Sequence, residues 1–119
     1  MTEPKNFELQ VTEQDGVLIF HMIGRLMDQQ TADLLMGALD KELAKGHKHV
    51  VLDMSRLQYM NSTGLNILIN VLTRSRNAGG DALIAGISES VRQLFIVTKL
   101  DSVFVLAKDI PAAISSIKA

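Results

Sequence analysis

Residues 50–72 have the sequence VVLDMSRLQYMNSTGLNILINVL, and this stretch predicts the fold more strongly than any other. It begins at residues 50–52 with an apolar, β-branched run, which is typical of a strand buried on both faces. Polar residues end this predicted strand, and a short connection from Asp53 and Ser55 leads to the Asn-Ser-Thr-Gly sequence at residues 61–64. Such small, hydrogen-bonding side chains before a long apolar pattern indicate a helix N-cap.

Ser62 therefore lies within the predicted cap, at a helix N-terminus. The first N–H groups of a helix lack intrahelical partners and the helix dipole is positive there, so this position accommodates an oxyanion.

The predicted helix separates into two arcs when residues are placed about 100° apart. The apolar arc consists of Leu65, Ile67, Leu68, Ile69, Val71 and Leu72. The polar arc consists of Asn66, Asn70, Thr73, Arg74 and Asn77. Because the polar arc holds no carboxylate, it fits a surface that meets another protein, and it fits a plain solvated face equally well.

This pattern resembles the STAS domain of bacterial anti-sigma-factor antagonists, also called anti-anti-sigma factors. The matching segments are VVLDMS at residues 50–55, Met60-Asn61-Ser62-Thr63-Gly64-Leu65, the apolar helix ending near residues 77–80, and Gly24-Arg25-Leu26 followed by Asp28 and Thr31. The resemblance covers nearly the whole chain. It implies a single STAS domain over residues 1–119.

In that family, the serine of an Asp-Ser-Ser or Asp-Ser-Thr triplet is phosphorylated by the partner anti-sigma factor, itself a serine kinase. By position this serine is Ser62. The resemblance thus implies an antagonist that binds an anti-sigma factor, is switched off by phosphorylation, and regulates transcription through sigma-factor release. A phosphatase would reset the switch. The residues expected to contact the partner are Asp28, Met60, Asn61, Ser62, Thr63, Asn66 and Asn70.

Three residues depart from the family pattern. Asn61 stands where the family usually has Asp, Arg25 stands where an acidic residue is common, and Met27 is an extra residue before Asp28. The first change removes a negative charge beside the phosphoacceptor, so phosphate on Thr63, or none, remains an alternative. The other two obscure which residue corresponds to the family's loop Asp.

The order of predicted elements gives an α/β fold. A hairpin around Asp15-Gly16 comes first, and strands then alternate with helices, which favours a mainly parallel βα sheet of four to five strands and about four helices. The predicted strands cover residues 7–13, 17–23, 50–52, 82–87 and 103–106. The predicted helices start after a loop over residues 24–30 capped by Thr31, at residues 61–64, at Ser88 and at Asp109. The predicted core contains Val51, Leu52, Leu65, Leu68, Ile69, Leu72, Leu83 and Phe95.

Composition excludes several classes of function. The 12 basic and 13 acidic residues give a formal net charge of −1, and with four Phe, one Tyr and no Trp the chain offers no basic or stacking surface for nucleic acid and no strong attraction to a membrane. There is no cysteine. Residues 1–10 contain no apolar run, so no signal peptide is predicted, and we expect a soluble cytoplasmic protein.

No enzyme, cofactor or metal motif stands out. The sequence contains no GxxxxGK[ST], GxGxxG, GxSxG or HExxH, and nothing local supplies a base for Ser62. His21 is predicted to be a hydrogen-bonded or edge residue, and His47 and His49 to be solvated. Two alternatives to the antagonist remain: an unphosphorylated STAS scaffold in a stress-signalling or lipid-transport complex, and, more remotely, a small enzyme.

Four further residues each have two interpretations. Met54 and Met60 flank the predicted loop before Ser62, and Met27 lies in the other loop expected nearby. Each of the three is either a core residue or an adaptable contact at a partner surface. Asp53 either tunes the surroundings of Ser62 or fixes a loop by a hydrogen bond.

Overall fold

The first element that the structure describes is a hairpin, whose turn, Asp15-Gly16, has the positive φ angles (55° and 79°) of a tight two-residue turn. The turn joins strand β1 (Phe7–Gln14) to strand β2 (Val17–Leu26) in the computed structural model, which describes residues 7–118. Most of the N-terminal segment for which no signal peptide is predicted lies outside the described residues, as does residue 119. The predicted hairpin is confirmed.

After the hairpin, strands and helices alternate. The strands are β3 (His49–Met60), β4 (Asp81–Ala85) and β5 (Leu106–Ala107); the helices are α1 (Gln29–Ala44), α2 (Ser62–Asn77), α3 (Glu89–Val97), α4 (Ile110–Lys118) and the short 3-10 helix η1 (Leu100–Ser102). The sheet has the order β1-β2-β3-β4-β5. Only β1 and β2 are antiparallel, and every other pair is parallel. The predicted α/β architecture is therefore confirmed.

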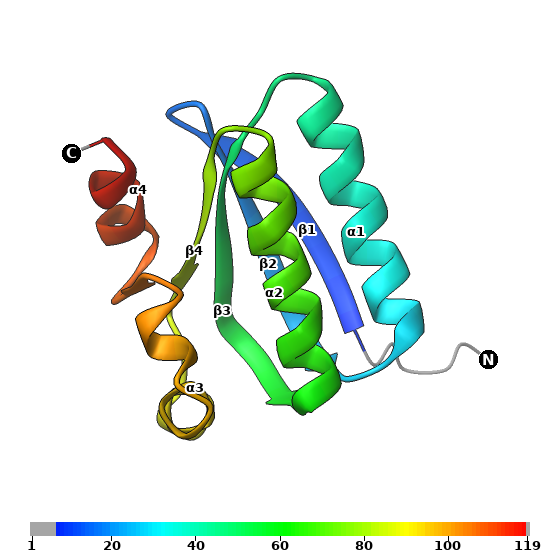
Figure 1. Cartoon of the computed structure of the whole chain (residues 1–119), viewed down its shortest axis with the longest axis vertical. Helices are drawn as coiled ribbons and strands as arrows, with labels where there is room; N and C mark the ends of the chain where they lie inside the picture. The colour runs from blue at the N-terminus through cyan, green and yellow to red at the C-terminus, as the bar shows by residue number, and fades with distance from the viewer. Residues whose placement is uncertain (1–6, 119) are drawn as a thin grey trace.

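The sheet has a separate core on each face. Helices α1, α2 and α3 cover one face, where the largest cluster of buried side chains includes Phe20, Leu52, Leu68 and Phe95. Helix α4 covers part of the other face, over a smaller cluster that includes Val51. Figure 1 shows α1 and α2 lying side by side and starting at the same edge of the sheet.

Seven of the eight predicted core residues are buried. The exception is Ile69, which is only partly buried and packs against the rim of the larger core. The buried arc of α2 is thus slightly narrower than the apolar arc in its sequence, because Ile69 borders the polar arc.

The central strand is much longer than predicted. Instead of ending near Asp53, β3 continues to Met60, because β2 pairs with it as far as the Leu26–Met60 position. The predicted short connection before the helix is wrong for this reason, as is the predicted loop at residues 24–30. Beyond Asp53, β3 has no pairing with β4, so its polar side chains remain exposed on the open side.

The last strand also differs from the prediction. Residues 103–105 form no strand, and β5 consists only of Leu106 and Ala107, which pair with the end of β4. A 3-10 helix occupies the preceding residues, and Phe104 turns into the core against Phe95, with ring centroids 5.7 Å apart. Among the described residues, no helix is long and apolar enough to cross a membrane.

Candidate functional site

Helix α2 begins where β3 ends, and Asn61 is the residue between them. Its backbone is extended (φ −116°, ψ −170°), and its Oδ1 atom accepts a hydrogen bond from the N–H of Gly64 at 3.0 Å. This geometry defines an N-cap, which satisfies an N–H group left unpaired in the first turn. The N-cap is therefore Asn61 alone, and Ser62 is the first residue of the helix.

Ser62 and Thr63 are both exposed on this first turn. Since Asn61 fills the capping role, the Ser62 hydroxyl remains at the surface, near the positive end of the helix dipole. The first turn of α2 contains no acidic residue. A negatively charged group attached to Ser62 would therefore meet no carboxylate within its own turn.

Asn61 makes a second contact that explains why an amide suits this position. Its Nδ2 atom donates a hydrogen bond to the main-chain oxygen of Met27 at 3.4 Å, in the segment between β2 and α1. An aspartate could cap α2 equally well but, when ionised, has no hydrogen to donate to Met27. Asn61 thus links the starts of both helices.

Gly64 brings α2 close to the end of β2. A Cβ atom on Gly64 would lie 2.3 Å from the carbonyl oxygen of Leu26 and 2.5 Å from Cγ of Met60. Neither distance is tolerable, so only glycine allows this contact. The first turn of α2 consequently packs against the end of β2.

Asp28 begins α1 at the same edge of the sheet. Its Oδ1 atom accepts hydrogen bonds from the N–H of Thr31 at 2.9 Å and from the Thr31 hydroxyl at 2.8 Å. These two hydrogen bonds lower the pKa of the Asp28 carboxyl below its usual range, despite a small opposing effect of burial. Asp28 is thus the N-cap, and the prediction that Thr31 caps this helix is wrong because its backbone is already helical.

The polar arc of α2 is exposed as predicted. Asn66, Asn70, Thr73, Arg74 and Asn77 all face solvent. In two of them the side chain has an intramolecular partner, since Arg74 pairs with Asp40 of α1 and the Thr73 hydroxyl donates to the carbonyl of Ile69. Asn66 and Asn70 therefore form the part of this face that continues from Ser62.

Met60, by contrast, is 7% exposed and belongs to the larger core. It lies beneath the first turn of α2, next to Gly64, and so supports this turn from the core. Met54 is buried, and Met27 is half-buried. For Met54 and Met60, the interpretation as core residues holds.

A groove that sequence reasoning missed lies between the end of β3 and α3. It has a volume of about 270 Å³ and is lined by Gln58, Tyr59, Met60, Ser90, Val91 and Leu94. Tyr59, which is 45% exposed, was the available signal, because aromatic residues are enriched where two proteins meet. The Arg25 guanidinium lies over this ring, with Cζ 5.7 Å from the centroid.

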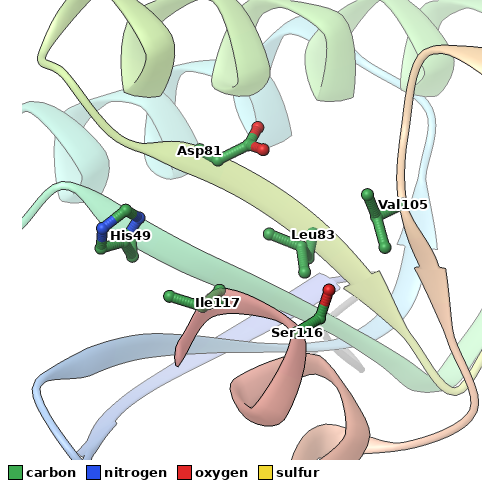
Figure 2. A pocket seen from close by; sticks show the side chains of 6 residues that line it. All are labelled: His49, Asp81, Leu83, Val105, Ser116 and Ile117. Carbon is green, nitrogen blue, oxygen red and sulfur yellow. The ribbon is translucent and has the colours of Figure 1, made fainter. Parts of the chain in front are cut away.

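A second hollow, of about 170 Å³, lies at the other end of the strands (Figure 2). It is lined by His49, Asp81, Leu83, Val105, Ser116 and Ile117. His49 and Asp81 are paired at the starts of β3 and β4, whereas Ser62 follows the end of β3. Asp81 already accepts hydrogen bonds from Arg76 and from the N–H of Ala82. This hollow therefore adds nothing to the chemistry at Ser62.

The three histidines contribute no catalytic set. His21 is hydrogen-bonded on both ring nitrogens, as predicted. His47 and His49 are half-buried, so the prediction that they are solvated is wrong; His47 bridges towards Glu13, with Nε2 2.9 Å from the carboxylate. Across the part of the chain that the structure describes, no three His, Cys, Asp or Glu side chains are arranged to hold a metal ion.

The sequence as a whole matches known proteins. The family model for the STAS domain matches residues 8–113. BtrV of Bordetella bronchiseptica, provisionally named an anti-sigma factor antagonist, is 30% identical over 111 residues, which make up 93% of this chain and 95% of BtrV. The anti-sigma F factor antagonist of Paenibacillus polymyxa is 26% identical over 96 residues, covering 80% of this chain and 81% of that protein.

Solved structures share the fold. The crystal structure of an anti-sigma factor antagonist from Mycobacterium paratuberculosis has a TM-score of 0.84 to this chain, at 24% identity and with all of both chains covered. The phosphorylated form of SpoIIAA from Bacillus has a TM-score of 0.70 at 15% identity, covering 93% of this chain and 98% of SpoIIAA.

Proposed function

This chain belongs to the STAS domain family, and we propose that it is an anti-sigma factor antagonist controlled by phosphorylation at Ser62. In this proposal it binds an anti-sigma factor in the cytoplasm and so releases a sigma factor for transcription. The partner is also a serine kinase, which ends the antagonism by phosphorylating Ser62. A phosphatase restores the active form.

The observation that carries this proposal is the exposed Ser62 at the first position of α2, immediately after the cap. A kinase requires a hydroxyl that is accessible and not already committed to capping. Asn61 meets the second condition by taking the capping hydrogen bond from Gly64. Thr63 is also exposed and is the alternative acceptor.

Phosphorylation at this position is expected to affect binding more than folding. A phosphoryl group adds about −1.5 to −2 charges at pH 7, and the N-terminus of a helix stabilises such a charge. A partner packed over Ser62 would have to desolvate that anion or oppose it with its own carboxylates, which weakens the complex.

The partner-binding surface in this proposal runs from the cap along the exposed face of α2. Its members are Asp28, Asn61, Ser62, Thr63, Asn66 and Asn70, with Met60 supporting them from the core. Helix α2 contains no acidic residue at any position. Apart from the Asp28 carboxylate, which caps α1, the surface therefore presents amides and hydroxyls.

A direct test is to incubate the purified protein with ATP and each candidate anti-sigma kinase of its genome, and to locate phosphate by mass spectrometry. We expect one phosphate, on Ser62, and none on a Ser62→Ala variant. Phosphate on Thr63 would move the switch by one residue. A kinase that binds tightly without transferring phosphate would instead favour the unphosphorylated scaffold.

A further inference from the structure

Strand β3 changes register where its pairing with β4 ends. Up to Asp53 it is paired on both sides, with His21 of β2 and Ala85 of β4. The next pair with β2 is Ile23 with Arg56, so β3 has one more residue than β2 between these two positions. This is a β-bulge, which bends a strand and strengthens its twist. Figure 1 shows β3 bending before it runs on to α2.

A chain of side-chain hydrogen bonds holds this bulge. Asp53 accepts a hydrogen bond from the N–H of Ser55 through Oδ1, at 3.1 Å, and its Oδ2 atom is 2.8 Å from Nδ1 of His21. The other ring nitrogen of His21 is 2.9 Å from the hydroxyl of Thr12 on β1. With hydrogen on Nδ1, His21 donates to Asp53 and accepts from Thr12, so the contacts join three strands.

Two further observations indicate that this arrangement is specific. Asp53, 8% exposed, is the only charged residue that is buried in the described part of the chain, and a buried charge is costly unless it is paired and hydrogen-bonded. On the β4 side, Gly86 has a φ angle of +72°, and a Cβ atom there would lie 3.1 Å from Cβ of Ser55. Glycine at position 86 thus leaves room for the bulge on the β4 side, and the contact between His21 and Asp53 fixes the bulge on the β2 side.

We propose that Asp53 and His21 are positioning residues for Ser62, because they set the bend after which residues 56–60 lead to the Asn61 cap. Of these, Arg56, Leu57, Tyr59 and Met60 pair with β2 and none pairs with β4, and a second register shift lies between Leu57 and Tyr59. The path of β3 to the cap therefore depends on its pairing with β2 and on both register shifts, the first of which Asp53 and His21 hold. The functional part of this inference rests on the proposed phosphorylation of Ser62. The geometric part concerns the free protein alone.

The test compares His21→Leu and Asp53→Ala with a matched control, His47→Leu. The control removes another His–carboxylate contact of 2.9 Å, from a side chain of similar exposure (23% against 19% for His21), at the far end of the strands. Backbone amide resonances of residues 56–64 are measured in the free proteins. Phosphorylation rates are measured with the kinase that modifies the wild type.

We expect both test variants to shift the resonances of residues 56–64 and to lower the phosphorylation rate about tenfold or more, since small misplacements of a reacting group are costly. The His47→Leu control should do neither. Two conservative variants, His21→Asn and His21→Gln, extend the test. The amide of His21→Asn places a donor near the position of Nδ1 and preserves the contact with Asp53, whereas the amide of His21→Gln lies near the position of Nε2. His21→Asn should therefore behave more like the wild type than His21→Gln does.

Unchanged resonances in both test variants would overturn the inference without any reference to a partner. Shifted resonances with a wild-type phosphorylation rate would overturn its functional part. If the wild type is neither phosphorylated nor bound by an anti-sigma factor, the proposed function fails. The spectra alone then decide whether Asp53 and His21 position the cap.

Discussion

The side-chain Nδ2 of Asn61 donates a hydrogen bond to the main-chain oxygen of Met27 at 3.4 Å, and the side-chain Oδ1 of Asn61 caps α2. One side chain therefore joins the starts of two helices. Asn61→Ala removes both contacts and should lower the free energy of unfolding by about 1 kcal/mol, as loss of a cap typically does. Asn61→Asp keeps the cap and should lose less. Urea unfolding of the three proteins checks this, and equal losses in both variants would contradict the role given to the cap.

The close contact of Gly64 with Leu26 gives a second prediction. Gly64→Ala should destabilise the protein by about 1–3 kcal/mol, because the added methyl group overlaps a main-chain carbonyl that cannot rotate away. Gly37, in the middle of α1, serves as the control because a Cβ atom there would have no neighbouring atom within 4 Å. Gly37→Ala should stabilise by about 0.5–1 kcal/mol through helix propensity. Thermal and urea unfolding of the two variants test this prediction. Similar effects at both positions would rule out the contact between Gly64 and Leu26 as the cause.

A charge at position 62 should weaken partner binding without lowering the stability of the fold. Ser62→Asp should bind the anti-sigma factor at least about tenfold more weakly than Ser62→Ala, since it places a charge where the partner packs. Both variants should melt close to the wild type, because a carboxylate is favourable at a helix N-terminus. Calorimetric titration and circular dichroism melting are the measurements. A Ser62→Asp variant that unfolds, or that binds as tightly as Ser62→Ala, would contradict the switch.

The exposed amides of α2 provide a test of the partner-binding surface. Asn66→Lys combined with Asn70→Lys should leave the unfolding free energy within about 0.5 kcal/mol of the wild type, as expected for exposed positions. Partner affinity should fall, because two bulky charges enter the interface. Asn77→Lys, about 22 Å further along the helix axis from Ser62, is the control. Unchanged affinity in the double variant would assign this face to solvent.

The carboxyl group of Asp53 makes the free energy of unfolding depend on pH in the acid range. Burial raises the pKa of its carboxyl, but hydrogen bonds from Ser55 and His21 outweigh burial and hold that pKa below its usual range. Because the folded pKa is lower than the unfolded one, the carboxylate stabilises the fold above about pH 4, and this contribution is lost as the pH falls through the folded pKa. Asp53→Asn should be less stable at pH 7 but lose less stability between about pH 5 and pH 3. Urea unfolding across that range checks it, and parallel pH curves would contradict it.

The sequence by itself was sufficient for the fold class, the hairpin, the apolar face of α2 and the location of Ser62 in its first turn. These features follow from local patterns: positive-φ residues at the turn, β-branched runs in buried strands, and apolar spacing close to 3.6 residues. Each is fixed by residues near one another in the chain. Val51, Leu52 and Leu68, predicted from these patterns, are all fully buried.

Only the tertiary structure decided the length of β3, the identity of the caps and the surroundings of Ser62. Residues 53–60 look like a connection because they are polar, yet pairing with β2 makes them a strand. Asn61, Ser62 and Thr31 are all plausible caps in sequence, and the choice depends on which backbone is extended and which carbonyl lies nearby. The contacts of Asn61 with Met27 and of His21 with Asp53 join residues 34 and 32 positions apart. No local pattern encodes contacts between residues so far apart in the chain, because they arise only when β2 and β3 pair side by side in the sheet.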